Sequence, residues 1–134
     1  PDDVAIWLDG GHNPAAATAV AETLRRVAPE GDRHLILGML ANKDPEGLLA
    51  PLAPLLASVT AVPVPGHEHH APADLASIAQ RLGIRSTMTA SDIPEALGWV
   101  RRRIDPRGEA PVVLILGSLY LAGTVLEAND ELPD

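Results

Sequence analysis

Short apolar runs alternate with amphipathic segments along the 134 residues of the chain. The apolar runs have the length of buried strands and predict strands at residues 4–8, 34–37, 59–64, 84–88 and 111–116. Between them, apolar residues recur at helical spacing and predict helices at residues 14–28, 45–57, 73–82, 92–103 and 119–127. This alternation indicates an α/β fold, an open and mostly parallel sheet flanked by helices.

Proline and capping residues refine this pattern at two helices. Asn13 and Pro14 are typical of an N-cap followed by the first helical position. Asp44 is the expected N-cap of the helix at 45–57, but Pro51 and Pro54 should kink or interrupt that helix, because proline has no N–H and its ring clashes with the preceding turn.

Composition favours a single compact domain. Hydrophobic residues make up 46% of the chain and aromatic residues only 2%, so the core must consist of leucine, valine, isoleucine and alanine. No apolar run approaches the roughly 20 residues of a membrane span, and no secretory leader opens the sequence, so we expect a soluble, cytoplasmic protein without a membrane partner. The first residues, Pro1-Asp2-Asp3, resemble the start of an excised C-terminal piece.

Charge and cysteine content exclude several classes of function. The chain has no cysteine, which excludes disulfides and thiolate metal sites. Its net charge of -8 argues against nucleic acid as a partner, since the only basic run is Arg101-Arg102-Arg103, which we interpret as a solvated helix end.

Three loops at predicted strand ends carry the unusual chemistry. They are Asp9-Gly10-Gly11-His12-Asn13-Pro14, the segment 38–44 (Gly-Met-Leu-Ala-Asn-Lys-Asp) and the segment 117–123 (Gly-Ser-Leu-Tyr-Leu-Ala-Gly). Because the strands of a parallel sheet point the same way, all three loops should meet at one edge, where such sheets bind ligands. The first loop joins a strand to a helix N-terminus, which suits an anion such as phosphate. One binding site is predicted.

Each candidate side chain has a structural alternative. Lys43 is the only lysine beside nine arginines, which favours a role for a compact ammonium, although an exposed loop lysine is the ordinary interpretation. Asp9 could form an Asx turn and His12 could pack at the start of the helix. Ser118 could simply cap the last helix.

Taken together, the three motifs resemble the C-terminal domain of folylpolyglutamate synthase/dihydrofolate synthase, a relative of the Mur ligases. Their order and spacing match, and the similarity covers essentially the whole chain. There are two small departures: Gly11 stands where alanine is common, and Asn42 where aspartate is common. The resemblance implies a Rossmann-like domain of the Mur ligase C-terminal type at residues 1–126. Residues 127–134 lose the apolar periodicity and turn acidic, which predicts an acidic tail.

The resemblance also implies an activity. The family phosphorylates a carboxylate of dihydropteroate or folate with ATP, and the amine of L-glutamate then attacks the acyl phosphate. By motif, Asp9, His12 and Asn13 would contact ATP, and His12, Lys43 and Ser118 would contact glutamate. His12 and Lys43 would be the catalytic residues.

Part of the machinery implied by the resemblance is missing from this chain. No Gly-x-x-x-x-Gly-Lys-Ser/Thr motif occurs in it, so the phosphate-binding loop and the Mg²⁺ ligands would belong to an N-terminal ATPase domain of the same protein. ATP and Mg²⁺ would be cofactors of that full-length enzyme, which we expect to be a monomer, and this part alone would be inactive.

Two alternatives stay open. The chain could be a Rossmann-like module that binds a nucleotide or phosphoester without catalysis. His67-Glu68-His69-His70 could bind a metal, but the prolines and Gly66 around it indicate a solvated loop at the rim of the site. The sequence does not separate dihydrofolate synthase from folylpolyglutamate synthase activity.

Overall fold

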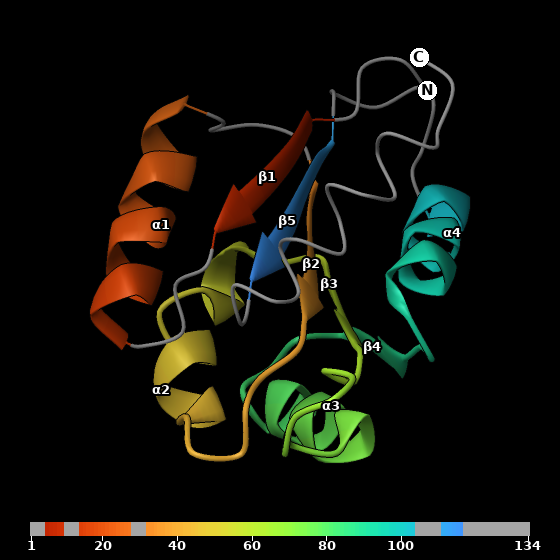
Figure 1. Ribbon diagram of the computed structural model, residues 1–134. Coiled ribbons are helices and arrows are strands. Elements are labelled where there is room, and N and C mark those ends of the chain that lie inside the picture. The colour runs from red at the N-terminus through yellow and green to blue at the C-terminus, as the bar shows by residue number, and fades with distance from the viewer. Residues whose placement is uncertain (1–4, 10–13, 28–31, 104–110, 117–134) are drawn as a thin grey trace.

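The computed structural model of the chain describes residues 5–9, 14–27, 32–103 and 111–116 (Figure 1). Strands and helices alternate along it, as the hydrophobic pattern predicts. In chain order the elements are β1 (Ala5–Asp9), α1 (Pro14–Val27), β2 (Arg33–Leu37), α2 (Pro45–Leu49), the 3₁₀ turn η1 (Ala53–Leu55), β3 (Ser58–Ala61), α3 (Pro72–Arg81), β4 (Ser86–Thr89), α4 (Ile93–Arg103) and β5 (Val112–Leu116).

The five described strands form one sheet in the order β1-β5-β2-β3-β4, and every neighbouring pair is parallel. β5 therefore lies between β1 and β2, although it is the last of these strands in the chain. All five of its residues are buried, which fits a central strand that is covered on both faces. The predicted α/β fold with a mostly parallel sheet is confirmed.

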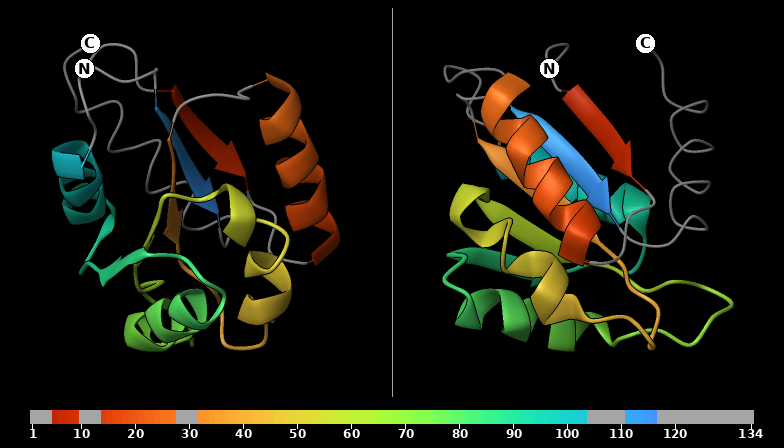
Figure 2. Two further views of the ribbon diagram at one scale, coloured as in Figure 1. Left: turned by 180° about the vertical axis from the view of Figure 1, so that it is seen from behind. Right: turned by 90° about the vertical axis from the view of Figure 1, so that its left-hand side faces the viewer.

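Helices cover both faces of this sheet (Figures 1 and 2). α1, α2 and α3 pack on one face, and α4 packs on the other. The strands divide their side chains accordingly: Leu35 and Leu37 of β2 face the first group, whereas Ile36 faces α4. This alternation is the two-residue period of a strand, so a single apolar strand packs side chains into the hydrophobic cores on both faces of the sheet.

The helix predicted at 45–57 is shorter in the structure. α2 ends at Leu49, and after a turn the 3₁₀ segment η1 follows. Pro51 and Pro54 account for the break, since neither can donate the backbone hydrogen bond that a continuous helix needs. Asp44 does occupy the N-cap position, but its side chain makes no capping hydrogen bond.

Other boundaries shift by a few residues. β4 begins at Ser86 rather than at residue 84, because α3 is closed by Gly83 with a φ of 95°, and Ile84 N–H still donates to the carbonyl of Ala79. β3 ends at Ala61 instead of residue 64, close before Pro63, which lacks an N–H for the ladder. The predicted cap at Asn13 and helix at 119–127 lie outside the described residues.

None of the described helices is long and apolar enough to cross a membrane.

Candidate functional site

The carboxyl ends of three neighbouring strands meet at one edge of the sheet. In the register, Asp9 at the end of β1 pairs with Leu116 at the end of β5, and Leu116 pairs with Leu37 at the end of β2. Gly38 N–H extends this ladder by donating to the Leu116 carbonyl at 3.3 Å. The three motif-bearing loops therefore leave from adjacent strands, as predicted.

The structure places only part of the predicted site. Asp9 is the last residue of β1, and this is all that the structure describes of it. His12, Asn13 and Ser118 lie outside the described residues, so their contacts to ATP and glutamate stay predictions. Lys43 is described in full, and it lies half-buried in the loop between β2 and α2.

The loop that carries Lys43, residues 38–44, is fixed at its base and at its tip. Met39 is fully buried in the core beneath α1, α2 and α3. Lys43 N–H donates to the Leu40 carbonyl at 3.1 Å, which closes a tight turn, and Leu48 N–H donates to the Asp44 carbonyl at 3.2 Å as α2 begins. The only lysine of the chain is therefore presented from an anchored turn at the carboxyl edge of the sheet.

A second loop, residues 64–70 after β3, packs against the first. Leu40 and His69 form an antiparallel bridge. Ala41 N–H donates to the Glu68 carbonyl at 3.0 Å, and His70 N–H donates to the Met39 carbonyl at 2.9 Å. The sequence predicts a solvated loop at the rim of the site, but it gives no sign that this loop pairs with the Lys43 loop.

The histidines of this second loop bind backbone carbonyls. His69 Nδ1–H donates to the carbonyl of His67 at 2.8 Å, and His70 Nε2–H donates to the carbonyl of Lys43, also at 2.8 Å. Among the residues that the structure describes, no group of three or more His, Cys, Asp or Glu side chains could hold a metal ion. His69 and His70 are thus each held by a backbone carbonyl.

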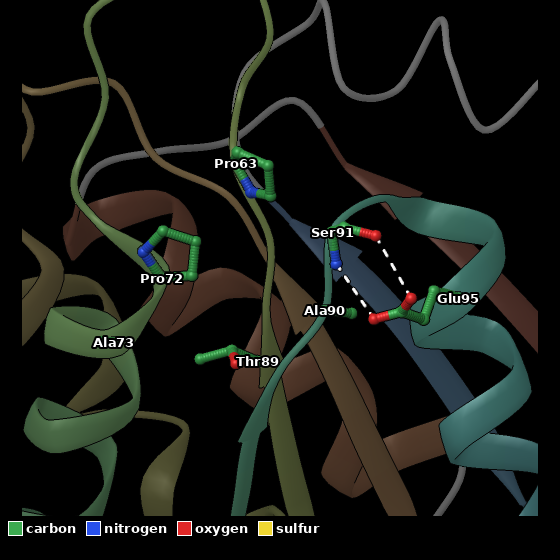
Figure 3. Close-up of a pocket in the computed structure, with 7 residues that line it drawn as sticks. All are labelled: Pro63, Pro72, Ala73, Thr89, Ala90, Ser91 and Glu95. Atoms are coloured by element: carbon green, nitrogen blue, oxygen red, sulfur yellow. Dashed lines mark hydrogen bonds between the residues drawn. The ribbon is translucent and has the colours of Figure 1, made fainter.

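A pocket of about 470 Å³ lies further along the same edge, between the ends of β3 and β4 (Figure 3). Pro63, Pro72, Ala73, Thr89, Ala90, Ser91 and Glu95 line it. Its acidic group is engaged in capping α4: Ser91 N–H and Oγ–H donate to the two carboxylate oxygens of Glu95 at 3.1 and 3.2 Å, and Glu95 N–H donates to Asp92 Oδ1 at 2.8 Å. The capping pattern Asp92-x-x-Glu95 was available in the sequence and was overlooked.

One buried histidine is remote from this edge. His34 lies near the beginning of β2, and its Nδ1 shares a hydrogen bond of 2.7 Å with Ser58 Oγ. Burial lowers the pKa of His34, and the charge of Arg103 lowers it further, while Asp32 opposes both effects. A buried neutral imidazole in β2 belongs to the core rather than to the candidate site.

Comparison with known proteins places this fold and these motifs in a family. Residues 1–119 match the family described as Mur ligase, glutamate ligase domain. A protein of Haloferax volcanii, described as a probable bifunctional folylpolyglutamate synthase/dihydropteroate synthase, is 34% identical over 116 residues. That alignment covers 87% of this chain and 13% of the Haloferax protein.

Solved structures agree with this match. The folylpolyglutamate synthase of Mycobacterium tuberculosis, complexed with ADP and AMPPCP, superposes with a TM-score of 0.84 at 27% identity and covers 96% of this chain. The bifunctional folylpolyglutamate synthase/dihydrofolate synthase of Yersinia pestis, complexed with AMPPNP and manganese, superposes with a TM-score of 0.77 at 26% identity and covers 93% of this chain. The chain spans 30% and 28% of those two proteins. With residues 1–119 matched, the chain belongs to the Mur ligase, glutamate ligase domain family.

Proposed function

We propose that this domain is the glutamate-binding part of an ATP-dependent amide ligase that adds L-glutamate to a folate or to dihydropteroate. The observation that carries the proposal is the register of β1, β5 and β2, which starts the three motif-bearing loops on adjacent strands at one edge. The family match and the names of the relatives support the same reaction. The remainder of the enzyme would include an N-terminal ATPase domain.

Lys43 is the described residue with the clearest role in this proposal. Its ammonium group suits a carboxylate of the incoming glutamate, because a compact cation can pair with a carboxylate and donate hydrogen bonds to it. The half-buried position and the anchored turn restrict where that charge can go. On this basis Lys43 orients glutamate, and its positive charge favours the approach of an amino acid with two carboxylate groups.

ATP and a divalent metal enter this proposal through the two solved structures above: both carry nucleotides, and the Yersinia pestis structure also carries manganese. The described residues of this chain contain no cluster of side chains suited to a metal, so we name no metal ligand among them and derive no step through the metal. Asp9, His12 and Asn13 are the proposed contacts to ATP, and His12 and Ser118 are further proposed contacts to glutamate.

The test is the replacement of Lys43 in the ligase polypeptide that carries this domain. Lys43→Met keeps much of the side-chain volume and removes the charge, and the loss of a charged hydrogen bond costs roughly 1.5–3 kcal/mol. The KM for glutamate should therefore rise by roughly ten- to 150-fold, with the KM for ATP nearly unchanged. Lys43→Arg should restore little, because a planar guanidinium does not replace a point charge.

Arg81→Met is the matched control, since Arg81 is an exposed cation in the last turn of α3. It should leave both KM values unchanged. If Lys43→Met behaves like this control, Lys43 does not bind glutamate. If its effect is confined to ATP, Lys43 is a nucleotide contact instead. A polypeptide that binds nucleotide and forms no amide bond with any glutamate acceptor would support the alternative, a binding module without catalysis.

A further inference from the structure

The hydrogen bonds between the two loops at the carboxyl edge differ in the atoms that make them. The bonds between Ala41 and Glu68 and between Met39 and His70 are made by backbone atoms at the base of the Lys43 loop. The third bond is made by a side chain: His70 Nε2–H donates to the carbonyl oxygen of Lys43 itself at 2.8 Å. His70 therefore reaches past the paired backbone and holds the residue that carries the ammonium group.

The hydrogen bond of the His70 imidazole can therefore be removed by substitution without removing the backbone hydrogen bonds between the two loops. A carbonyl oxygen can only accept, so the proton of the bond must be on Nε2 of His70. Removing the ring leaves the backbone bonds at Met39 and Ala41 in place, because they do not involve a side chain of the second loop. What is lost is the restraint on residue 43, where a small change in backbone direction is amplified along a lysine side chain of four flexible bonds.

We propose that His70 is a positioning residue that fixes Lys43 and thereby sets the affinity of the ligase for the carboxylate of its amino-acid substrate. The inference rests on the proposed function, because it takes Lys43 as the group that pairs with glutamate. His70 does not touch the substrate in this proposal. It acts only through the Lys43 carbonyl, and the half-buried position of both residues shields their bond from competing water.

Three substitutions of His70 in the ligase polypeptide test this. His70→Ala removes the donor, and the KM for glutamate should rise about three- to tenfold, with kcat at saturating glutamate and the KM for ATP unchanged. His70→Gln places an amide N–H near the position of Nε2 and should restore most of the affinity. His70→Asn is too short for that and should resemble His70→Ala. A general loosening of the loop would not distinguish the two amides.

His69→Ala is the matched control. His69 is also half-buried and lies in the same loop, but its imidazole bonds the His67 carbonyl within that loop. It should change the KM for glutamate less than twofold. An effect as large as that of His70→Ala would overturn the proposal, and so would a His70→Gln variant no better than His70→Asn.

A double-mutant cycle with Lys43→Met separates this inference from the proposed function. If His70 acts through Lys43, His70→Ala should add nothing to the KM for glutamate in the Lys43→Met background. If Lys43→Met raises that KM and His70→Ala alone does not, His70 is no positioning residue and the role of Lys43 stands. If Lys43→Met itself has no effect, the proposed role of Lys43 fails and the inference fails with it.

Discussion

Lowering the pH should destabilise this domain through His34, a residue outside the candidate site. His34 is only 3% exposed, and it lies in β2 two residues before Ile36, which packs in the core layer under α4. Nδ1 shares its hydrogen bond with Ser58 Oγ, and among the described residues Nε2 has no hydrogen-bond partner. Protonation would place a full charge in this apolar layer beside Arg103, which is why burial and Arg103 lower the pKa of His34 while Asp32 raises it.

The sign of the effect follows from proton binding in the two states. The unfolded chain takes up a proton at the ordinary histidine pKa of 6.5, whereas folded His34 resists protonation until lower pH. The stabilisation by neutral His34 is therefore complete above a pH of about 6.5 and decreases as the pH falls below it. One proton gives a slope of at most about 1.4 kcal/mol per pH unit, so the loss at a pH of about 5.5 is at most about 1.4 kcal/mol.

The assay is chemical denaturation of the 134-residue chain, followed by circular dichroism, between pH values of about 8 and 5. The comparison is with His34→Asn, whose amide can keep the bond to Ser58 at the position of Nδ1 but does not titrate. The variant should be less stable at every pH, because a smaller side chain leaves space in the core. Its free energy of unfolding should fall less steeply than that of the parent below a pH of about 6.5.

The control for a shortened core side chain is Ile36→Val, in the same strand as His34, which removes a buried methylene group and no titratable group. This variant should keep the slope of the parent protein. Acidic and other histidine side chains contribute equally to all three proteins, so only the difference in slope is interpreted. Equal slopes in the parent and in His34→Asn would refute the reasoning, since they would mean that folded and unfolded His34 bind protons alike.

Two further predictions concern the proposed enzyme. The 134-residue chain alone should fold but show no ligase or ATPase activity, because it lacks a phosphate-binding loop. For the same reason it should bind ATP with a Kd of about 1 mM or weaker, and a micromolar Kd measured by calorimetry would contradict this. In the ligase polypeptide, His12→Ala should lower kcat more than it weakens ATP binding, because a contact beside the transferred phosphate strengthens in the transition state. Unchanged turnover with only a raised KM for ATP would place His12 in ground-state binding.

The order and type of the elements could be predicted because they depend on local periodicity. The apolar run that ends at Leu116 has no polar residue to turn outward, which predicted a strand covered on both faces, and β5 is such a strand. The early end of α2 before Pro51 and Pro54 was also predictable from local sequence, because a proline lacks the backbone N–H that would continue the helix in which it stands. The boundaries were less accurate where a turn such as that at Gly83 decides them.

The pairing of the two loops could not be predicted in this way. Pro65 and Gly66 indicate a turn after β3, and Gly66 has the positive φ of 82° that such a turn requires. Neither residue tells which part of the chain the turn approaches. The sheet determines which loops meet. β3 pairs with β2 from His34–Ser58 to Leu37–Ala61, so the loops that follow these two strands begin side by side.

The candidate site therefore depends on a loop that lies outside the three sequence motifs. Lys43 is the only lysine of the chain, which favours a role for its ammonium group, but its backbone carbonyl is bound by His70 from the loop after β3. A change in the length of the segment after β3 would move His70 without altering any of the three sequence motifs. The motifs alone therefore do not specify the proposed glutamate site, because the register of β2 on β3 and the length of the loop after β3 place His70 against the Lys43 carbonyl.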